Sequence, residues 1–442
     1  MQDRKGLHMW KKVKTAISLM LISTLFLMAC GEKEAETGEA VSQETTENNT
    51  DTGAEASEET EPEELSGELT ILSWVPSNKW DHVIEGFTQE HPGVTVTVDM
   101  PKQEEVLTEE FVERYNTRIM TGDGIDIVES DLVNMERCME QGLFVDMYEL
   151  MDADEDFHRE DYFSCIFEPV EIDGKLPAFV YNVQPVYIHL NKKLLEEAGL
   201  EYTEDTISFK ELYGLYEKVR ETAGEQIFLT ASGYGYEGMS SYETNYFIRN
   251  NLMDSDEYEE YLKMCHNLYY TSENRPSRSD GTMKIADDVF CCPSDLRLSG
   301  SNANEVFEGT EDMTGAIIYE SMHGERYFWA PTSVAVSSFS ENKKLAWEFI
   351  KFTFSDKDSG YNYTSAFYPN KRKLERACEG LTPENKEKLY RDIEAINTMS
   401  YSDMDLNNNL QSIYDDYFVN NTITAEECRK ALADRVYMYM NE

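Results

Sequence analysis

Residues 67–98 read GELTILSWVPSNKWDHVIEGFTQEHPGVTVTV, and this segment sets the architecture expected of the whole chain. Apolar and polar residues alternate over residues 68–74, as in a strand with one buried face. Residues 79–90 carry apolar side chains at helical spacing of three and four, namely Trp80, Val83, Ile84 and Phe87. Pro92-Gly93 ends that helix before a second alternating strand at 94–98. A strand, a helix and a strand in this order predict a βαβ unit.

The same alternation continues along the chain. The patterns predict helices at 104–120, 132–150, 192–198 and 208–222, a strand at 125–128 and extended chain over 179–190. Strands separated by helices indicate an α/β protein with a largely parallel sheet. About 375 residues follow position 66, which is enough for two lobes with separate cores.

The N-terminal thirty residues resemble a bacterial lipoprotein signal. Lys11, Lys12 and Lys14 precede an apolar run at 17–28, which is too short for a span of ~20 residues but suits an export signal. Leu27-Met28-Ala29-Cys30 then matches a lipobox, in which the cysteine is diacylated, and two acyl chains anchor a protein stably. We therefore expect residues 1–29 to be a signal peptide and Cys30 to be lipidated. The alternative is an ordinary signal peptide in which Cys30 falls by chance.

Residues 30–66 are acidic and poor in large apolar side chains, so we expect a disordered tether between the anchor and the folded part. The whole chain of 442 residues has a net charge of −47. Such an acidic surface argues against nucleic acid and against electrostatic adhesion to anionic lipid. We expect the lipid to be the only membrane contact, which places the protein on the extracytoplasmic face of the cell membrane.

The remaining cysteines show no CxxC motif and no metal-ligand spacing with histidine. Scattered cysteines in a large chain are typical of small buried apolar residues. The adjacent pair Cys291-Cys292 leaves a redox role open. We expect no bound metal and no cofactor.

Several segments, in order, resemble the family 1 extracellular solute-binding proteins, the sugar-binding lipoproteins of ABC importers. The opening segment, 87–96, resembles the family's helix, Pro-Gly and strand, and the most specific match is 187–200, YIHLNKKLLEEAGL. The other matching segments are 121–128, 141–146, 174–177, 334–352 and 368–372. The chain departs from the family pattern between about 225 and 325, where residues 287–292 are the candidate replacement for a usual strand.

The resemblance implies a two-lobed periplasmic-binding-protein-like (Venus flytrap) fold with the ligand in a cleft between the lobes. The expected boundaries are 67–182 with 329–378 for the first lobe, and 183–328 with 379–442 for the second. Closure around the ligand would be a hinge motion near 180–184 and 330–333. The resemblance also implies a monomer that delivers its solute to the permease subunits of an ABC transporter and catalyses no reaction.

Ligands of open α/β sheets bind beyond the carboxyl ends of the strands, and sugars need aromatic faces with carboxylate or amide partners. We therefore expect a ligand site built from Trp74, Glu129, Asp131, Tyr181, Asn182, Tyr236 and Trp329. Core packing remains an alternative for Trp74 and Trp329, and solvated loop positions remain one for the two acids. Trp80 and Trp347 lie at helical spacing among apolar residues, so we expect both in the core.

Two other functions remain open on the sequence alone. A polyamine or another cationic solute would also suit an acidic cleft with aromatic walls. A secreted glycosidase needs only two carboxylates, but no nucleophile elbow, zinc-protease helix or Walker motif is present. Residues 152–156 begin like a calcium loop, yet Phe157 stands where that loop needs glycine, so we expect an exposed acidic turn.

Overall fold

The structure is a computed structural model. It describes residues 64–74, 76–106, 108–130, 133–180, 183–224, 227–230, 243–272, 289–294, 303–329, 333–355, 368–400 and 404–441. The chain divides into two units, Met1–Ser66 and Gly67–Glu442, and everything below concerns the second. The expected signal peptide, Cys30 and nearly all of the expected tether lie outside the described residues.

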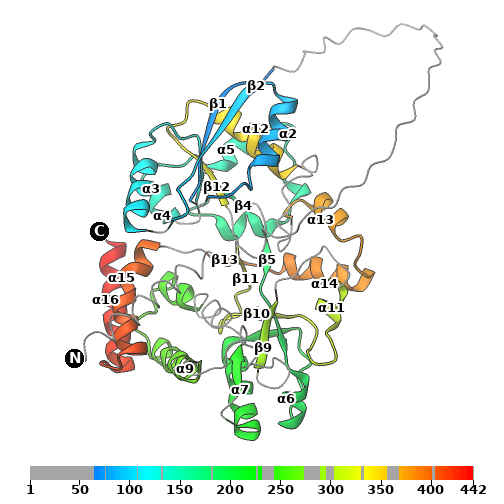
Figure 1. Ribbon diagram of the computed structural model, residues 1–442, viewed down its shortest axis with the longest axis vertical. Helices are drawn as coiled ribbons and strands as arrows, with labels where there is room; N and C mark the ends of the chain where they lie inside the picture. Colours follow the sequence, from blue (N-terminus) through cyan, green and yellow to red (C-terminus); the bar gives the residue numbers. More distant parts are fainter. Residues whose placement is uncertain are drawn as a thin grey trace, which may run out of the picture. The chain divides into compact units, whose positions relative to one another are not determined.

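The first sheet has the strand order β2-β1-β3-β12-β4 (Figure 1). Its strands are β1 (Ser66–Leu72), β2 (Gly93–Asp99), β3 (Ile127–Glu129), β4 (Phe179–Val180) and β12 (Ser333–Val336). β1 runs parallel to β3, whereas β12 runs antiparallel to both β3 and β4. The expected βαβ opening is confirmed, with α2 (Asp81–Glu90) between β1 and β2.

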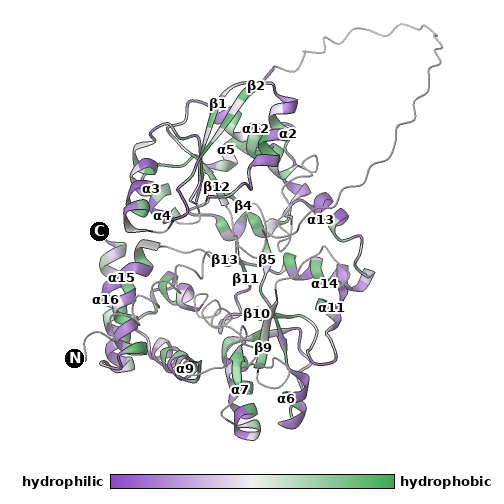
Figure 2. Cartoon of the chain, in the orientation of Figure 1, coloured by the Kyte–Doolittle hydropathy of each residue, from purple (hydrophilic) through white to green (hydrophobic). Residues whose placement is uncertain are grey.

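Helix α2 packs against α12 (Lys343–Phe354) through aromatic rings. The centroids of Phe87 and Phe349 are 5.2 Å apart in an edge-to-face arrangement, and Trp80 lies 5.9 Å from Phe349. Trp80 and Trp347 are 1% and 3% exposed, so the expected core positions of both are confirmed. Figure 2 shows the same trend, with apolar residues along the strands and on one side of these helices.

The helix expected over 132–150 is two short helices, α4 (Met135–Glu140) and α5 (Met147–Asp152). Gly142 has a φ of 66°, a left-handed conformation that ends the first helix and that glycine adopts without steric cost. Asp146 then caps α5 by accepting a hydrogen bond from the Tyr148 N–H at 3.0 Å. The preceding helix, α3 (Glu109–Thr121), begins later than expected because Thr108 caps it at Phe111.

The acidic turn after α5 is anchored to α12. The Asp154 carboxylate accepts a hydrogen bond from Trp347 Nε1 at 2.8 Å and binds Lys351 Nζ at 2.6 Å. Three single-turn helices follow: η1 (Arg159–Asp161), η2 (Ser164–Ile166) and η3 (Glu168–Val170). Through Asp154, the acidic turn is attached to α12 and stabilises the helices that pack on the first sheet.

The second sheet has the order β7-β10-β6-β9-β8. Its strands are β6 (Tyr187–Leu190), β7 (Thr206–Ser208), β8 (Phe228–Thr230), β9 (Val289–Ser294) and β10 (Ile317–Glu320). β6 is antiparallel to its neighbours β9 and β10, while β7 pairs parallel with β10 and β8 with β9. Strand β9 forms within the segment expected to replace a usual strand of the family.

Helices of the second sheet begin with α6 (Lys192–Glu197) and α7 (Phe209–Ala223), close to their expected bounds. A capping box at Ser208 and Glu211 fixes the start of α7. The remaining helices are α9 (Asp256–Ser272), α11 (Ala303–Glu308), α13 (Lys371–Ala377), α14 (Pro383–Glu394), α15 (Met404–Tyr414), the π-helical η4 (Asp415–Val419) and α16 (Ala425–Met440). Leu410, Cys428 and Leu432 from the last helices join the core of the second sheet.

A third, small sheet of order β13-β11-β5 lies where the chain passes from one large sheet to the other. Its strands are β5 (Gln184–Pro185), β11 (Tyr327–Trp329) and β13 (Thr398–Ser400). Val180 pairs with Ser333 in the first sheet, and Gln184 pairs with Trp329 in the small one. The outgoing and returning chains therefore cross side by side. The chain expected to be extended over 179–190 forms β4, β5 and β6.

The described cysteines are buried, as their scattered positions predicted: Cys138, Cys165, Cys265, Cys291, Cys378 and Cys428. Burial raises the pKa of the thiols of Cys165, Cys378 and Cys428 to about 12. Cys291 points into the core of the second sheet and is 0% exposed. These thiols behave as apolar packing groups.

Candidate functional site

One edge of the first sheet gathers the segments that the sequence assigned to the ligand. β1 and β3 are parallel and end at Leu72 and Glu129, and β4 ends at Val180 beside the start of β12 at Ser333. Ser130 is tied to Ser333 by a backbone hydrogen bond of 2.9 Å and by a 2.9 Å contact between the two hydroxyl oxygens. This is the carboxyl edge of the sheet, where open α/β folds bind ligands.

Glu129 and Trp74 meet at this edge. The Trp74 N–H donates to Glu129 Oε2 at 3.3 Å, and the Ser73 hydroxyl donates to the same oxygen at 2.8 Å. Glu129 is 0% exposed and Trp74 is 8% exposed. The sequence correctly placed both residues at the end of neighbouring strands, although it did not indicate how deeply the carboxylate is buried.

Lys79 and Trp80 also bind this carboxylate, and sequence reasoning missed that role. Lys79 Nζ lies 2.7 Å from Glu129 Oε1, with the lysine side chain 7% exposed. Trp80 Nε1 donates to Glu129 Oε1 at 2.7 Å. The only available signal was a lysine directly before a core tryptophan, because the partner carboxylate belongs to a strand far along the chain.

The other predicted residues are placed less fully. Asp131 and the pair Tyr181-Asn182 lie outside the described residues, but each directly follows a described end of a strand, at Ser130 and Val180. Trp329 is the last residue of β11, so its backbone is fixed by pairing with Gln184. Tyr236 lies outside the described residues.

The corresponding edge of the second sheet contains a buried acid that the sequence did not single out. Glu243 begins a helical stretch at 243–249, is 0% exposed, and accepts hydrogen bonds from the Tyr319 hydroxyl at 2.9 Å and the Met322 N–H at 3.2 Å. Burial is the main cause that raises the pKa of the Glu243 carboxyl to about 7; the nearby charges of Glu325 and Glu257 act in the same direction, and the hydrogen bonds from Tyr319 and Met322 act against it. Tyr319 belongs to β10, so this acid lies at the carboxyl end of a strand.

An aromatic pair lies next to Glu243. The rings of Tyr246 and His323 are stacked with centroids 4.0 Å apart. His323 Nε2 is 3.3 Å from Glu257, and Arg249 is 3.2 Å from Glu325. Tyr246 therefore packs against an imidazole ring.

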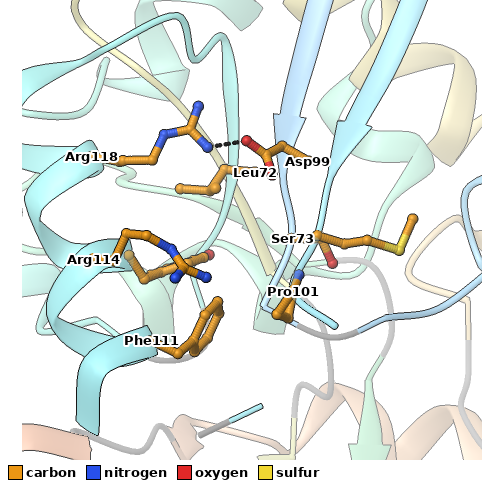
Figure 3. A pocket seen from close by; sticks show the side chains of 9 residues that line it. Leu72, Ser73, Asp99, Pro101, Phe111, Arg114 and Arg118 are labelled. Atoms are coloured by element: carbon orange, nitrogen blue, oxygen red, sulfur yellow. Dashed lines mark hydrogen bonds and ion pairs between the residues drawn. The ribbon is translucent and has the colours of Figure 1, made fainter. Parts of the chain in front are cut away.

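Two hollows in the described part of the chain differ in size. The smaller one, about 30 Å³, lies between α3 and the ends of β1 and β2, where Arg118 pairs with Asp99 and the Arg114 side chain extends toward Pro101 (Figure 3). Its volume holds little more than a water molecule. The larger, about 520 Å³, has an aromatic lining that includes Tyr162 and Phe163, with Arg159 and Lys371 among its charged residues. Neither hollow includes any of the seven predicted ligand residues.

No described helix is long and apolar enough to cross a membrane. Within the described ranges, no three histidine, cysteine, aspartate or glutamate side chains gather closely enough to hold a metal ion.

The model of the bacterial extracellular solute-binding protein family matches residues 74–359. A search of curated protein sequences finds no match to the chain. Among solved structures, an ABC substrate-binding protein from Listeria monocytogenes in complex with cycloalternan is similar, with 17% identity and a TM-score of 0.55, covering 85% of this chain and 99% of that one.

Two further structures are similar to a comparable degree. A sugar transporter from Rhizobium etli in an open conformation has 16% identity and a TM-score of 0.55, covering 84% of this chain and 99% of that one. A maltose-bound MalE3 from T. maritima has 16% identity and a TM-score of 0.54 over the same shares of the two chains. At these identities the likeness establishes the two-lobed fold.

Proposed function

Because the chain belongs to the bacterial extracellular solute-binding protein family, we propose that it captures a carbohydrate and delivers it to an ABC importer. Its capture step is closure of the two lobes, which ligand drives by binding the closed state more tightly than the open one. The adjacent chain crossings at Val180–Ser333 and Gln184–Trp329 support a hinge at the expected positions. The protein works by binding and releases its ligand unchanged.

The ion pair between Lys79 and Glu129 favours a neutral ligand over a cationic one. A cationic solute such as a polyamine needs carboxylates whose charge is not already neutralised. At the first sheet's edge, the buried carboxylate is paired with a lysine of the same chain. Sugars in complex with two of the structural relatives, cycloalternan and maltose, agree with a neutral carbohydrate.

We place the ligand against Trp74, Asp131, Tyr181, Asn182, Tyr236 and Trp329, with Glu129 beneath them. Aromatic faces would stack on the sugar rings. The Asp131 carboxylate would accept hydrogen bonds from sugar hydroxyl groups, and the Asn182 amide would both accept and donate them. Trp74→Ala should weaken sugar binding at least tenfold if the indole stacks on the ligand. Unchanged affinity would return Trp74 to a purely structural role.

A thermal-shift screen of the full chain tests the ligand class. Maltose, cyclic oligosaccharides, putrescine and spermidine are compared, since a ligand at 100 times its Kd stabilises the folded state by about 2.7 kcal/mol. We expect a sugar to raise the melting temperature by a few degrees and the amines to leave it unchanged. A shift with an amine and none with any carbohydrate would overturn the sugar proposal.

The location follows from the N-terminal signal. We propose that Cys30 is diacylated and that residues 31–66 tether the binding unit within reach of its permease. Cys30→Ala should release the protein into the medium, as measured by fractionation and immunoblotting. Continued membrane association of that variant would contradict the anchor.

A further inference from the structure

The chain segment that joins β1 to α2 is tied to Glu129 by four donors. Ser73, Trp74, Lys79 and Trp80 supply them, at distances of 2.7 to 3.3 Å from the two carboxylate oxygens. All four belong to residues 73–80, whereas the acceptor belongs to β3, the middle strand of the sheet. One side chain thus fixes the whole segment.

Glu129 has no capacity left for a ligand. A carboxylate offers about four lone-pair positions, and these four donors occupy that number. The residue is 0% exposed, so no ligand hydroxyl can approach it. Its backbone carbonyl oxygen accepts the Tyr115 hydroxyl of α3, which holds it from the helix side as well.

The ion pair makes this arrangement hard to distort. Removing a buried charge from its partner costs several kcal/mol, because neither group regains water while it stays inside. A shift of residues 73–80 that separated Lys79 from Glu129 would strand two such charges. Trp74, two residues after the end of β1, is carried on the segment that this pair fixes.

We propose that Glu129 is the positioning residue of the 73–80 segment: it holds Trp74 in its ligand-facing place and does not itself touch the ligand. The ligand-facing part rests on the proposed function, which puts this sheet edge at the binding site. The sequence suggested that Glu129 accepts hydrogen bonds from ligand hydroxyl groups. In this proposal the neighbouring residues accept them instead.

Hydrogen exchange tests the positioning without any ligand. The full chain is compared with Glu129→Gln, Lys79→Met and the double variant. Glutamine keeps one acceptor oxygen but cannot neutralise Lys79 or accept bonds at its amide nitrogen. We expect exchange of the amides in 73–80 to rise at least tenfold in Glu129→Gln, with β6 and β10 unchanged, and to return to within threefold of wild type in the double variant.

Unchanged exchange in Glu129→Gln would overturn the proposal, as would an increase spread evenly over both large sheets. Asp154→Asn is the matched control, because Asp154 also binds a tryptophan indole and a lysine. That variant should leave exchange at 73–80 unchanged. If Glu129→Gln does not fold, Lys79→Met takes its place, because it breaks the same ion pair from the other side. A tenfold rise of exchange at 73–80 supports the proposal, and unchanged exchange contradicts it.

Ligand affinity separates positioning from direct contact. With maltose as the probe, Glu129→Gln should weaken binding at least tenfold and the double variant should restore it to within threefold. A residue that touched the ligand would leave the double variant as weak as the single one, and that result overturns the proposal. If maltose does not bind the wild-type chain, the maltose part of the proposed function fails, while the exchange measurement still decides the positioning role.

Discussion

Glu129 and Glu243 are both fully buried carboxylates at the carboxyl edge of a large sheet, yet their surroundings differ. Glu129 is paired with Lys79 and accepts three further hydrogen bonds. Glu243 accepts bonds from Tyr319 and Met322, and among the described residues no cation forms an ion pair with it. Burial accordingly raises the pKa of the Glu243 carboxyl to about 7.

The difference has a consequence for pH. The Lys79 ammonium compensates the charge of Glu129 at the first edge. At the second edge, burial is the main cause that raises the pKa of Glu243, and the charges of the more exposed Glu325 and Glu257 add to it. The ionisation of Glu243 therefore makes the stability of the fold depend on pH.

Lys79→Met should give the largest loss of stability among these variants, because it removes the ion-pair partner of Glu129. It leaves the Glu129 carboxylate buried without a counter-charge, and such a loss costs about 3–5 kcal/mol of unfolding free energy. Urea unfolding at pH 7 measures it. Adding Glu129→Gln to the same chain should recover most of the loss, and a double variant as unstable as the single one would show that the lysine acts through packing alone.

Glu243→Gln should stabilise the protein above pH 7. The pKa of this carboxyl is raised to about 7 in the folded chain, so its ionisation destabilises the fold as pH rises from about 4.5 to 7. Each pKa unit is worth about 1.4 kcal/mol, which gives a gain of about 3 kcal/mol for the neutral amide at pH 8. Thermal unfolding at pH 4 and pH 8 checks the sign.

At pH 4 the wild-type carboxyl is protonated in both states, and the variant should show no gain. Equal effects at the two pH values would contradict ionisation as the cause. Glu305→Gln, at an exposed position on α11, serves as the control.

Trp80→Phe removes the indole donor to Glu129 while keeping an aromatic ring in the core. A bond to a charged acceptor is worth about 1.5–3 kcal/mol. Equilibrium unfolding measures the loss. Trp347→Phe, which removes the donor to Asp154, is the parallel case, and a much smaller effect at Trp80 would mean that its indole bond adds little to the ion pair.

Ser73→Ala should have the smallest effect. It removes one hydroxyl donor of 2.8 Å and leaves the other three contacts to Glu129 in place, so the expected loss is about 1.5 kcal/mol, the lower end of the range for a charged acceptor. Unfolding by urea resolves it. Thr121→Ala, at an exposed helix position, should change stability by less than half as much.

Local sequence patterns predicted the elements well and the contacts poorly. The alternation at 68–74 and the helical spacing at 79–90 depend on neighbours, and both elements are present. The prediction of one continuous helix over 132–150 was wrong, because Gly142 ends the first of two short helices. Trp80 and Trp347 were placed in the core by their spacing, but nothing in the spacing named their acid partners.

The residues that meet at the carboxyl edge of the first sheet were predictable for a different reason. Residues after strands meet wherever the strands are parallel neighbours, so the ends of β1 and β3 had to bring Trp74 and Glu129 together. Which donors complete the Glu129 carboxylate depends on how the 73–80 segment folds back over the sheet. That path is set by packing between distant parts of the chain. The buried position of Glu243 was not predicted for the same reason, because its partners Tyr319 and Met322 lie far along the chain.

The buried thiols give this protein an unusual dependence on staying folded. Six described cysteines are buried, in a family of extracellular proteins, and oxidants outside the cytoplasm form disulfides. Burial keeps them as unreactive thiols, so the fold itself is their protection. Once unfolded in air, the chain would crosslink at random and not return, and its useful lifetime outside the cell is set by how rarely it opens.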